Sequence, residues 1–155
     1  MNKLQYYIQE KLKINSKSKI IKYNYNYHPK DKNELEKIVN KLIKERGENA
    51  DLNDIDTSEI IDMGNLFAYS DFNGDISDWD VSNVIDMSYM FFESEFTGEN
   101  GDISNWNVSK VRLMNRMFGY SKFNGDISKW NVSKKVSLDG MFDCCFLKNE
   151  PKWYK

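Results

Sequence analysis

The chain repeats one block of sequence, and this repetition limits the folds that it can adopt. The residues Gly-Asp-Ile-Ser occur at 74–77, 101–104 and 125–128, so successive copies begin 27 and then 24 residues apart. A weaker copy precedes them, in which Phe67 takes the position of Phe91. A fixed period of about 20–50 residues is typical of proteins whose units stack and bury their apolar faces against their neighbours. The sequence therefore predicts a stack of about four units.

The spacing of apolar residues changes along each unit. In the second unit these residues are Phe72, Ile76, Trp79, Val81, Val84, Met87, Met90 and Phe91. A spacing close to 2 over 72–77 predicts a short strand, and a spacing of 3 to 4 over 84–91 predicts a helical turn. We therefore expect an α/β fold, a short right-handed solenoid with one strand and one helical turn in each unit.

Matched positions of successive units should form ladders along the core. Phe72, Phe96 and Phe123 form one such set, and Trp79, Trp106 and Trp130 form another. Exposed tryptophans could stack on bases or sugars, but their fixed place in the apolar set predicts burial. Pairs of Asp or Asn with a serine two residues later should satisfy backbone groups in turns; these are Asp56–Ser58, Asp80–Ser82, Asn107–Ser109 and Asn131–Ser133.

The first 50 residues lack the repeat and are expected to cap one end of the stack. Residues 1–14 have helical spacing, and Lys19–Tyr27 alternates as a strand does. Asp31 and Glu34 form a capping-box pattern, and the amphipathic run that follows predicts a helix over 31–46, ended by a glycine.

These patterns divide the chain into three parts. A helix-strand-helix capping region occupies 1–50, the repeats occupy 51–147, and a tail occupies 148–155. We expect Pro151 and Trp153 in the tail to cover the open end of the last unit.

The wording of the repeat is similar to that of a known family. The pattern Phe-Asn-Gly-Asp-Ile-Ser-x-Trp-Asp/Asn-Val-Ser-x-Val-x-x-Met-x-x-Met-Phe covers about 51–147. It resembles the BspA-like leucine-rich repeats, which occur in surface proteins and in uncharacterised proteins of AT-rich bacteria and their phages. The resemblance implies a leucine-rich-repeat-like solenoid and a role in binding, but it implies no activity.

Charge is sorted along the chain. Residues 1–50 carry twelve Lys/Arg and six Asp/Glu, residues 51–102 carry fourteen Asp/Glu and no Lys or Arg, and residues 103–155 carry ten Lys/Arg and four Asp/Glu. Such blocks are usually solvated faces, but clustered like charge also costs self-repulsion that a basic partner would offset. We therefore predict that the acidic second unit contacts a partner, through Asp75, Asp78, Asp80, Asp86, Glu93, Glu95 and Glu99.

The residues that could carry chemistry lack the companions that chemistry requires. His28 has no nucleophile motif beside it, so we expect a turn or capping role. Cys144 and Cys145 are adjacent, which strains a disulfide, and no second pair completes a zinc site, so we expect small buried packing residues. Asp71 to Asp75 resembles a calcium loop without its distal glutamate, so a turn is favoured. We expect no enzymatic activity, no cofactor and no metal.

The sequence therefore favours a non-enzymatic protein-interaction module. Its partner is expected to be a protein with a basic surface, without direct binding to nucleic acid or membrane. The alternative is a phage-encoded anti-defence inhibitor that occupies the basic nucleic-acid groove of a host nuclease. The first residues have no apolar signal region and no stretch approaches the ~20 apolar residues of a membrane span, so we expect a cytoplasmic location. The sequence does not set the oligomeric state.

Overall fold

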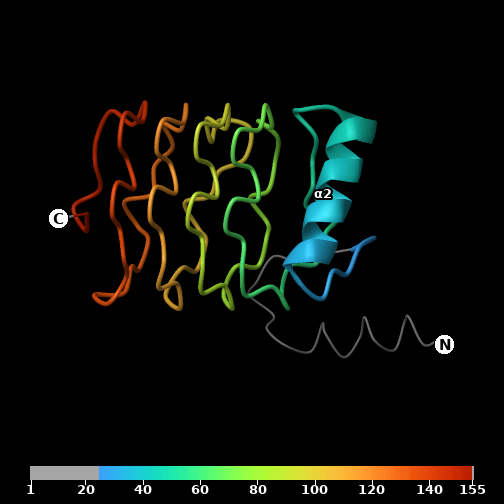
Figure 1. The fold of residues 1–155 in the computed structure, drawn as a ribbon, viewed down its shortest axis with the longest axis horizontal. Coiled ribbons are helices and arrows are strands. Elements are labelled where there is room, and N and C mark those ends of the chain that lie inside the picture. The colour runs from blue at the N-terminus through green and yellow to red at the C-terminus, as the bar shows by residue number, and fades with distance from the viewer. Residues whose placement is uncertain (1–24, 155) are drawn as a thin grey trace, which may run out of the picture.

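The computed structural model describes residues 25–154, which form a stack of coils with one helix at one end (Figure 1). The helix predicted over 1–14 and most of the strand predicted over 19–27 lie outside the described residues. Of that strand, Tyr27 is described, and it forms an isolated parallel β-bridge with Ile55. No helix in the described part of the chain is long and apolar enough to cross a membrane.

The helix predicted over 31–46 is confirmed as α2, Lys32–Arg46. Asp31 Oδ1 accepts a hydrogen bond from the backbone N–H of Glu34 at 3.0 Å, and the Glu34 carboxylate accepts one from the backbone N–H of Lys30 at 2.8 Å. These two bonds stabilise the first turn, and the expected glycine ends the helix with a φ of 89°. The buried side chains of α2 join the core, and they are Leu35, Val39 and Leu42.

The expected α/β leucine-rich-repeat solenoid is wrong. Within residues 25–154, α2 is the only helix, and the coils are joined by five isolated parallel bridges rather than by a sheet. The segment 72–77, expected to be a strand, contributes only Asp75 to a bridge, with Asp51. The segment 84–91, expected to be a helical turn, contains consecutive turns instead.

These turns do not become helical because their backbone N–H groups alternate between two kinds of acceptor. The N–H of Met90 donates to Met87 O in its own coil at 3.2 Å, whereas the N–H of Phe91 donates to Met117 O in the next coil at 2.9 Å. An α-helix would send both to carbonyls four residues back. In addition, Tyr89 and Glu93 have φ of 58° and 50°, the left-handed region that a right-handed helix excludes.

Each coil has two walls in which successive segments lie side by side. We call the outer surface formed by 61–69, 85–93, 112–120 and 136–144 the aromatic wall, and that formed by 50–58, 74–82, 101–109 and 125–133 the polar wall. The register of the aromatic wall is fixed by the bridges Asp62↔Asp86, Asp86↔Leu113 and Leu113↔Ser137, and the first two segments of the polar wall are joined by Asp51↔Asp75.

Two ladders of phenylalanine rings fill the core. The predicted ladder is confirmed, since Phe72 stacks on Phe96 at 6.4 Å and Phe96 on Phe123 at 6.1 Å. A second ladder runs beside it, with ring centroids 5.4, 5.5 and 5.9 Å apart along Phe67, Phe91, Phe118 and Phe142. The predicted burial of the tryptophans is also confirmed: the exposed fraction is 3–4% for Trp79, Trp106 and Trp130.

The two ends of the stack are covered differently. α2 lies at one end, and residues 147–154 lie at the other (Figure 1). In the tail, Trp153 stacks on Trp130 at 6.3 Å and donates its indole N–H to Ile127 O at 3.0 Å. Pro151 is buried, so the expected cover at this end is confirmed.

Candidate partner-binding surface

Half of the acidic residues in 51–102 accept backbone hydrogen bonds that stabilise turns. Asp75 Oδ1 accepts hydrogen bonds from the backbone N–H of Ser77 at 2.9 Å and from its hydroxyl at 2.7 Å. The same bond to the N–H two residues later is made by seven of the fourteen acidic residues in 51–102, namely Asp51, Asp56, Asp62, Asp75, Asp80, Asp86 and Asp102. Much of the negative charge is therefore required by local backbone geometry.

The predicted serine turns are confirmed in three of the four pairs. Ser58, Ser82 and Ser109 each donate their backbone N–H to the side chain two residues earlier, at 3.1, 2.9 and 3.3 Å. The fourth pair differs, because the Ser133 hydroxyl accepts from the backbone N–H of Lys135 at 3.2 Å.

The turn bonds lower the pKa of several aspartates. Burial alone would raise the pKa of Asp75, but the hydrogen bonds from Ser77 outweigh it, so this pKa lies below its ordinary value. The pKa of Asp56 is lowered in the same way, where bonds from Ser58 and the His28 contact outweigh burial. Donors that bind the charged form favour ionisation, so these carboxylates are held as acceptors.

The seven predicted contact residues do not lie in one patch. Asp75, Asp78 and Asp80 belong to the polar wall, whereas Asp86 and Glu93 belong to the aromatic wall. The remaining two, Glu95 and Glu99, lie in the longer segment that connects the walls; Glu95 forms an ion pair with Lys122, and the backbone N–H of Glu99 donates to Thr97 Oγ1 at 3.1 Å.

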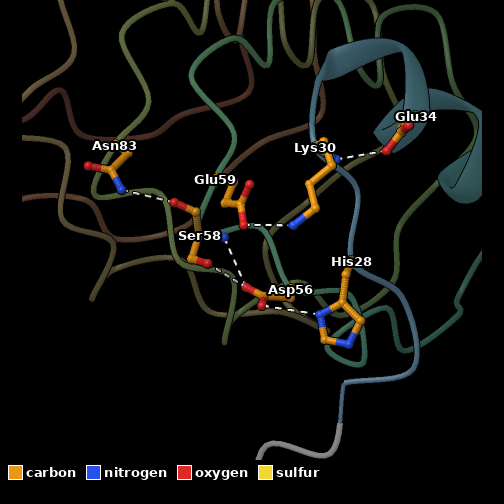
Figure 2. Close-up of polar contacts among 7 residues, drawn as sticks. All are labelled: His28, Lys30, Glu34, Asp56, Ser58, Glu59 and Asn83. Atoms are coloured by element: carbon orange, nitrogen blue, oxygen red, sulfur yellow. Dashed lines mark hydrogen bonds and ion pairs between the residues drawn. The ribbon is translucent and has the colours of Figure 1, made fainter.

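His28 lies in a polar cluster that ties the segment before α2 to the first coil (Figure 2). Its Nδ1 lies 3.3 Å from Asp56 Oδ2, and the Ser58 hydroxyl donates to Asp56 Oδ1 at 2.7 Å. Lys30 Nζ donates to Glu59 Oε1 at 2.7 Å beside them. The aspartate therefore occupies the centre, whereas activation of a serine needs the histidine there.

The two cysteines differ in environment, and the expected burial is wrong for one of them. Cys144 is exposed, whereas Cys145 is half-buried and donates its Sγ–H to Phe123 O at 3.3 Å. Burial raises the pKa of the Cys145 thiol. Both cysteines are free thiols.

The residues that resembled a calcium loop have partners within the protein. Asn73 Oδ1 accepts from the backbone N–H and the hydroxyl of Thr97, at 2.9 and 3.0 Å, and Asp75 anchors its own turn. Among residues 25–154, no group of three or more His, Cys, Asp or Glu side chains is arranged to hold a metal ion.

Exposed tyrosines gather around Phe92 on the aromatic wall. The rings of Tyr69, Tyr89 and Tyr120 contact the Phe92 ring edge-on, at centroid distances of 5.6, 5.4 and 5.7 Å. Tyr69 and Tyr120 are 70% and 52% exposed, whereas Phe92 is 7% exposed. Sequence reasoning missed this cluster, although Tyr69 and Tyr120 occupy matched positions outside the apolar set, and that match is the available signal.

A shallow hollow of about 450 Å³ adjoins the same wall. Its lining combines exposed isoleucines with charged and amide side chains from three successive coils, namely Glu59, Ile61, Asn83, Ile85, Lys110 and Arg112. Lys110 Nζ donates to Asn83 Oδ1 at 2.7 Å across the hollow. The aromatic wall thus presents apolar side chains and both signs of charge.

The repeats and α2 together match one family model, described as a Mycoplasma protein of unknown function, DUF285, over residues 34–153. The chain belongs to this family. The family match begins within α2 and ends at Trp153 in the tail, so the helix, the coils and the terminal cover all belong to it. Searches of curated proteins and of solved structures find no match.

Proposed function

We propose that the chain is a non-enzymatic protein-interaction module that binds its partner through the outer face of the aromatic wall. One observation carries this proposal. Five of the six exposed large hydrophobic side chains in the described part of the chain belong to that wall: Ile61, Tyr69, Ile85, Leu113 and Tyr120. Surfaces that bind proteins are enriched in tyrosine and arginine, and contiguous exposed apolar side chains mark such surfaces.

The charge of this wall favours a basic partner. The four segments of this wall carry five acidic residues and two basic ones; the acidic residues are Asp62, Asp86, Glu93, Asp139 and Asp143, and the basic residues are Arg112 and Arg116. A basic partner would gain long-range attraction and faster association. The predicted contacts Asp86 and Glu93 belong to the proposed face. The other five predicted contacts lie outside it: Asp75, Asp78 and Asp80 on the polar wall, and Glu95 and Glu99 in the connecting segment.

The finer features read from the sequence accompany this proposal. The resemblance of the repeat sequence to BspA-like repeats supports a binding role by analogy alone. The cytoplasmic location and the absence of enzymatic activity stay predictions.

A site-specific crosslinking experiment tests the proposal. A photoreactive residue is placed at Tyr120 on the aromatic wall or, as a matched control, at Asp78 on the polar wall, and crosslinked proteins are identified by mass spectrometry. With the purified partner, Tyr69→Ala/Tyr120→Ala should weaken binding at least about tenfold, since exposed aromatic anchors dominate interface energies. The control Asp78→Ala/Asn105→Ala should bind as the wild type does.

Salt and competition separate the outcomes. Binding should weaken as salt rises, and Glu93→Lys should slow association more than it speeds dissociation. If only the polar-wall variant Asp78→Ala/Asn105→Ala loses binding, the partner contacts the polar wall and the proposal is overturned. A nuclease partner whose nucleic acid competes with the chain would instead support the inhibitor hypothesis.

A further inference from the structure

The aromatic wall ends in a row of backbone donors that have no acceptor in the described part of the chain. In each earlier coil, four alternate N–H groups donate to the next coil; in the third coil they belong to Met114, Arg116, Phe118 and Tyr120, at 2.7–3.0 Å. The matching groups of the last coil belong to Leu138, Gly140, Phe142 and Cys144, and none has an acceptor within residues 25–154. Unpaired donors at an edge are a template for another chain.

The tail leaves this row open because it follows the polar wall. The Lys148 N–H donates to Asn124 Oδ1 at 3.1 Å, and the Trp153 indole donates to Ile127 O. Tyr154 reaches the aromatic wall only as a ring against the Phe142 ring, at 4.8 Å. Phe146, next to the row in sequence, is 65% exposed, so apolar surface accompanies the free donors.

A second copy of this chain is poorly suited to fill the row. The end of a copy that would present matching carbonyl groups is the end at which α2 lies (Figure 1). The helix buries Leu35, Val39 and Leu42 in the core there. A direct coil-to-coil contact between two copies would therefore require α2 to move away.

The sign of charge changes twice along the aromatic wall, whose first segment, 61–69, carries only Asp62 and is acidic like the second. Segment 85–93 carries Asp86 and Glu93, and segment 112–120 carries only Arg112 and Arg116. Segment 136–144 carries only the exposed Asp139 and Asp143. These two exposed carboxylates at the open end would be complemented by a basic segment. The carboxylates at this end also affect Tyr154. Burial raises the pKa of Tyr154, and the negative charges of Glu150, Asp143 and Asp139 raise it further.

We propose that the open end of the aromatic wall binds a basic repeat segment of a partner protein that carries the same repeat. The segment would supply alternate carbonyl groups to Leu138, Gly140, Phe142 and Cys144, as each coil supplies them to the one before it. Its Lys or Arg side chains would face Asp139 and Asp143. This site is separate from the face proposed above and does not depend on it.

The chain itself offers matched probes for a test with the full-length protein. A synthetic peptide of residues 112–121 is the basic probe, and a peptide of residues 85–94 is its acidic counterpart from the same repeat. Amide hydrogen exchange is followed by NMR with and without each peptide. The basic peptide should slow exchange at the four open amides at least about tenfold at saturation, while the Met141 amide, already bonded to Leu138 O, should not change.

Charge reversal gives the second readout. Asp139→Lys/Asp143→Lys should lose the basic peptide and gain the acidic one, whereas the control Asp71→Lys/Asp78→Lys should retain the wild-type preference. If Asp139→Lys/Asp143→Lys does not fold, the salt dependence of the wild type tests the same point. The basic peptide should then bind wild type more weakly at high salt. Equal binding of both peptides, or unchanged exchange at the four amides, overturns the proposal. Concentration-dependent protection of these amides without peptide would identify a second copy as the occupant and overturn it too.

Discussion

At the scale of single residues, the tryptophans at matched positions of the repeat differ in the hydrogen bonds of their indole N–H groups. The indole N–H of Trp79 donates to Leu52 O and that of Trp130 donates to Ile103 O, both at 2.9 Å. The indole N–H of Trp106 is buried and has no acceptor among the described residues. Trp106 is the first tryptophan after the three-residue lengthening of the repeat. A buried unpaired donor costs about 1–3 kcal/mol.

Replacing these tryptophans should separate packing from hydrogen bonding. Trp106→Ala should cost on the order of 3–5 kcal/mol of unfolding free energy because it empties a buried site. Trp106→Phe should cost about 1–2 kcal/mol less than Trp130→Phe, because the second change loses the hydrogen bond to Ile103 O, whereas the first removes a buried donor that has no acceptor. Urea unfolding of the three variants measures both differences. An equal cost for the two Phe variants would show that the Trp106 N–H is satisfied.

Gly74 stands where the backbones of two coils approach closely. A Cβ atom there would lie 2.0 Å from Ala50 O, a backbone atom that cannot swing aside. We expect Gly74→Ala to cost on the order of 3 kcal/mol. Gly119→Ala is the control, since its Cβ would meet only side-chain atoms, the Phe92 ring at 3.1 Å and Arg116 Cβ at 3.5 Å. Thermal unfolding should rank the control nearer to wild type, and the reverse order would contradict the close approach.

At the scale of elements, two segments with similar apolar spacing take different structures. α2 has a cap at each end and sends its N–H groups back along the chain. In the turns of the aromatic wall, alternate N–H groups donate to carbonyl groups of the next coil. Each segment of this wall also has two residues with a left-handed backbone conformation. An apolar spacing of 3 to 4 residues is therefore compatible with a helix in one segment and with consecutive turns in the other.

Substitution at Arg116, which is exposed and has a φ of 50°, should distinguish turns from a helix. Arg116→Gly should be more stable than Arg116→Ala by about 1 kcal/mol, because only glycine adopts the left-handed region freely. In a helix the order would be reversed, with alanine favoured by about 1 kcal/mol. Chemical denaturation of the two variants measures the sign, and a more stable alanine variant would show that this segment is helical.

At the scale of the whole molecule, the turn aspartates link stability to pH. The pKa values of Asp54, Asp56, Asp75 and Asp126 all lie below the ordinary value. For Asp54 the leading cause is the Arg46 guanidinium, which donates to both carboxylate oxygens at 2.8 and 2.9 Å. These contacts distribute the acid sensitivity over the first coil, the second coil and the last.

Stability should therefore fall in acid. An aspartate with a lowered folded-state pKa stabilises fully above its unfolded pKa of about 3.9, and this contribution disappears as pH falls through the folded value. Asp75→Asn keeps an acceptor for Ser77, as Asn107 does for Ser109, but does not titrate. Its unfolding free energy should decline less than that of wild type as the pH falls from 5 to below the unfolded-state pKa of about 3.9. Parallel curves would show that Asp75 contributes nothing.

The sequence by itself determined the repeat, the buried rings, α2 and the serine turns. These features follow from local rules, since Asp31 caps a helix and Asp75 binds the N–H two residues later wherever such residues occur. Only the tertiary structure decided the path of the coils. Tyr89 and Glu93 carry no local signal for a left-handed conformation, and they adopt it because bonds to the next coil outweigh its strain. The separation of the seven carboxylates over two walls and the segment that connects them has the same origin, because that path sets the position of each side chain.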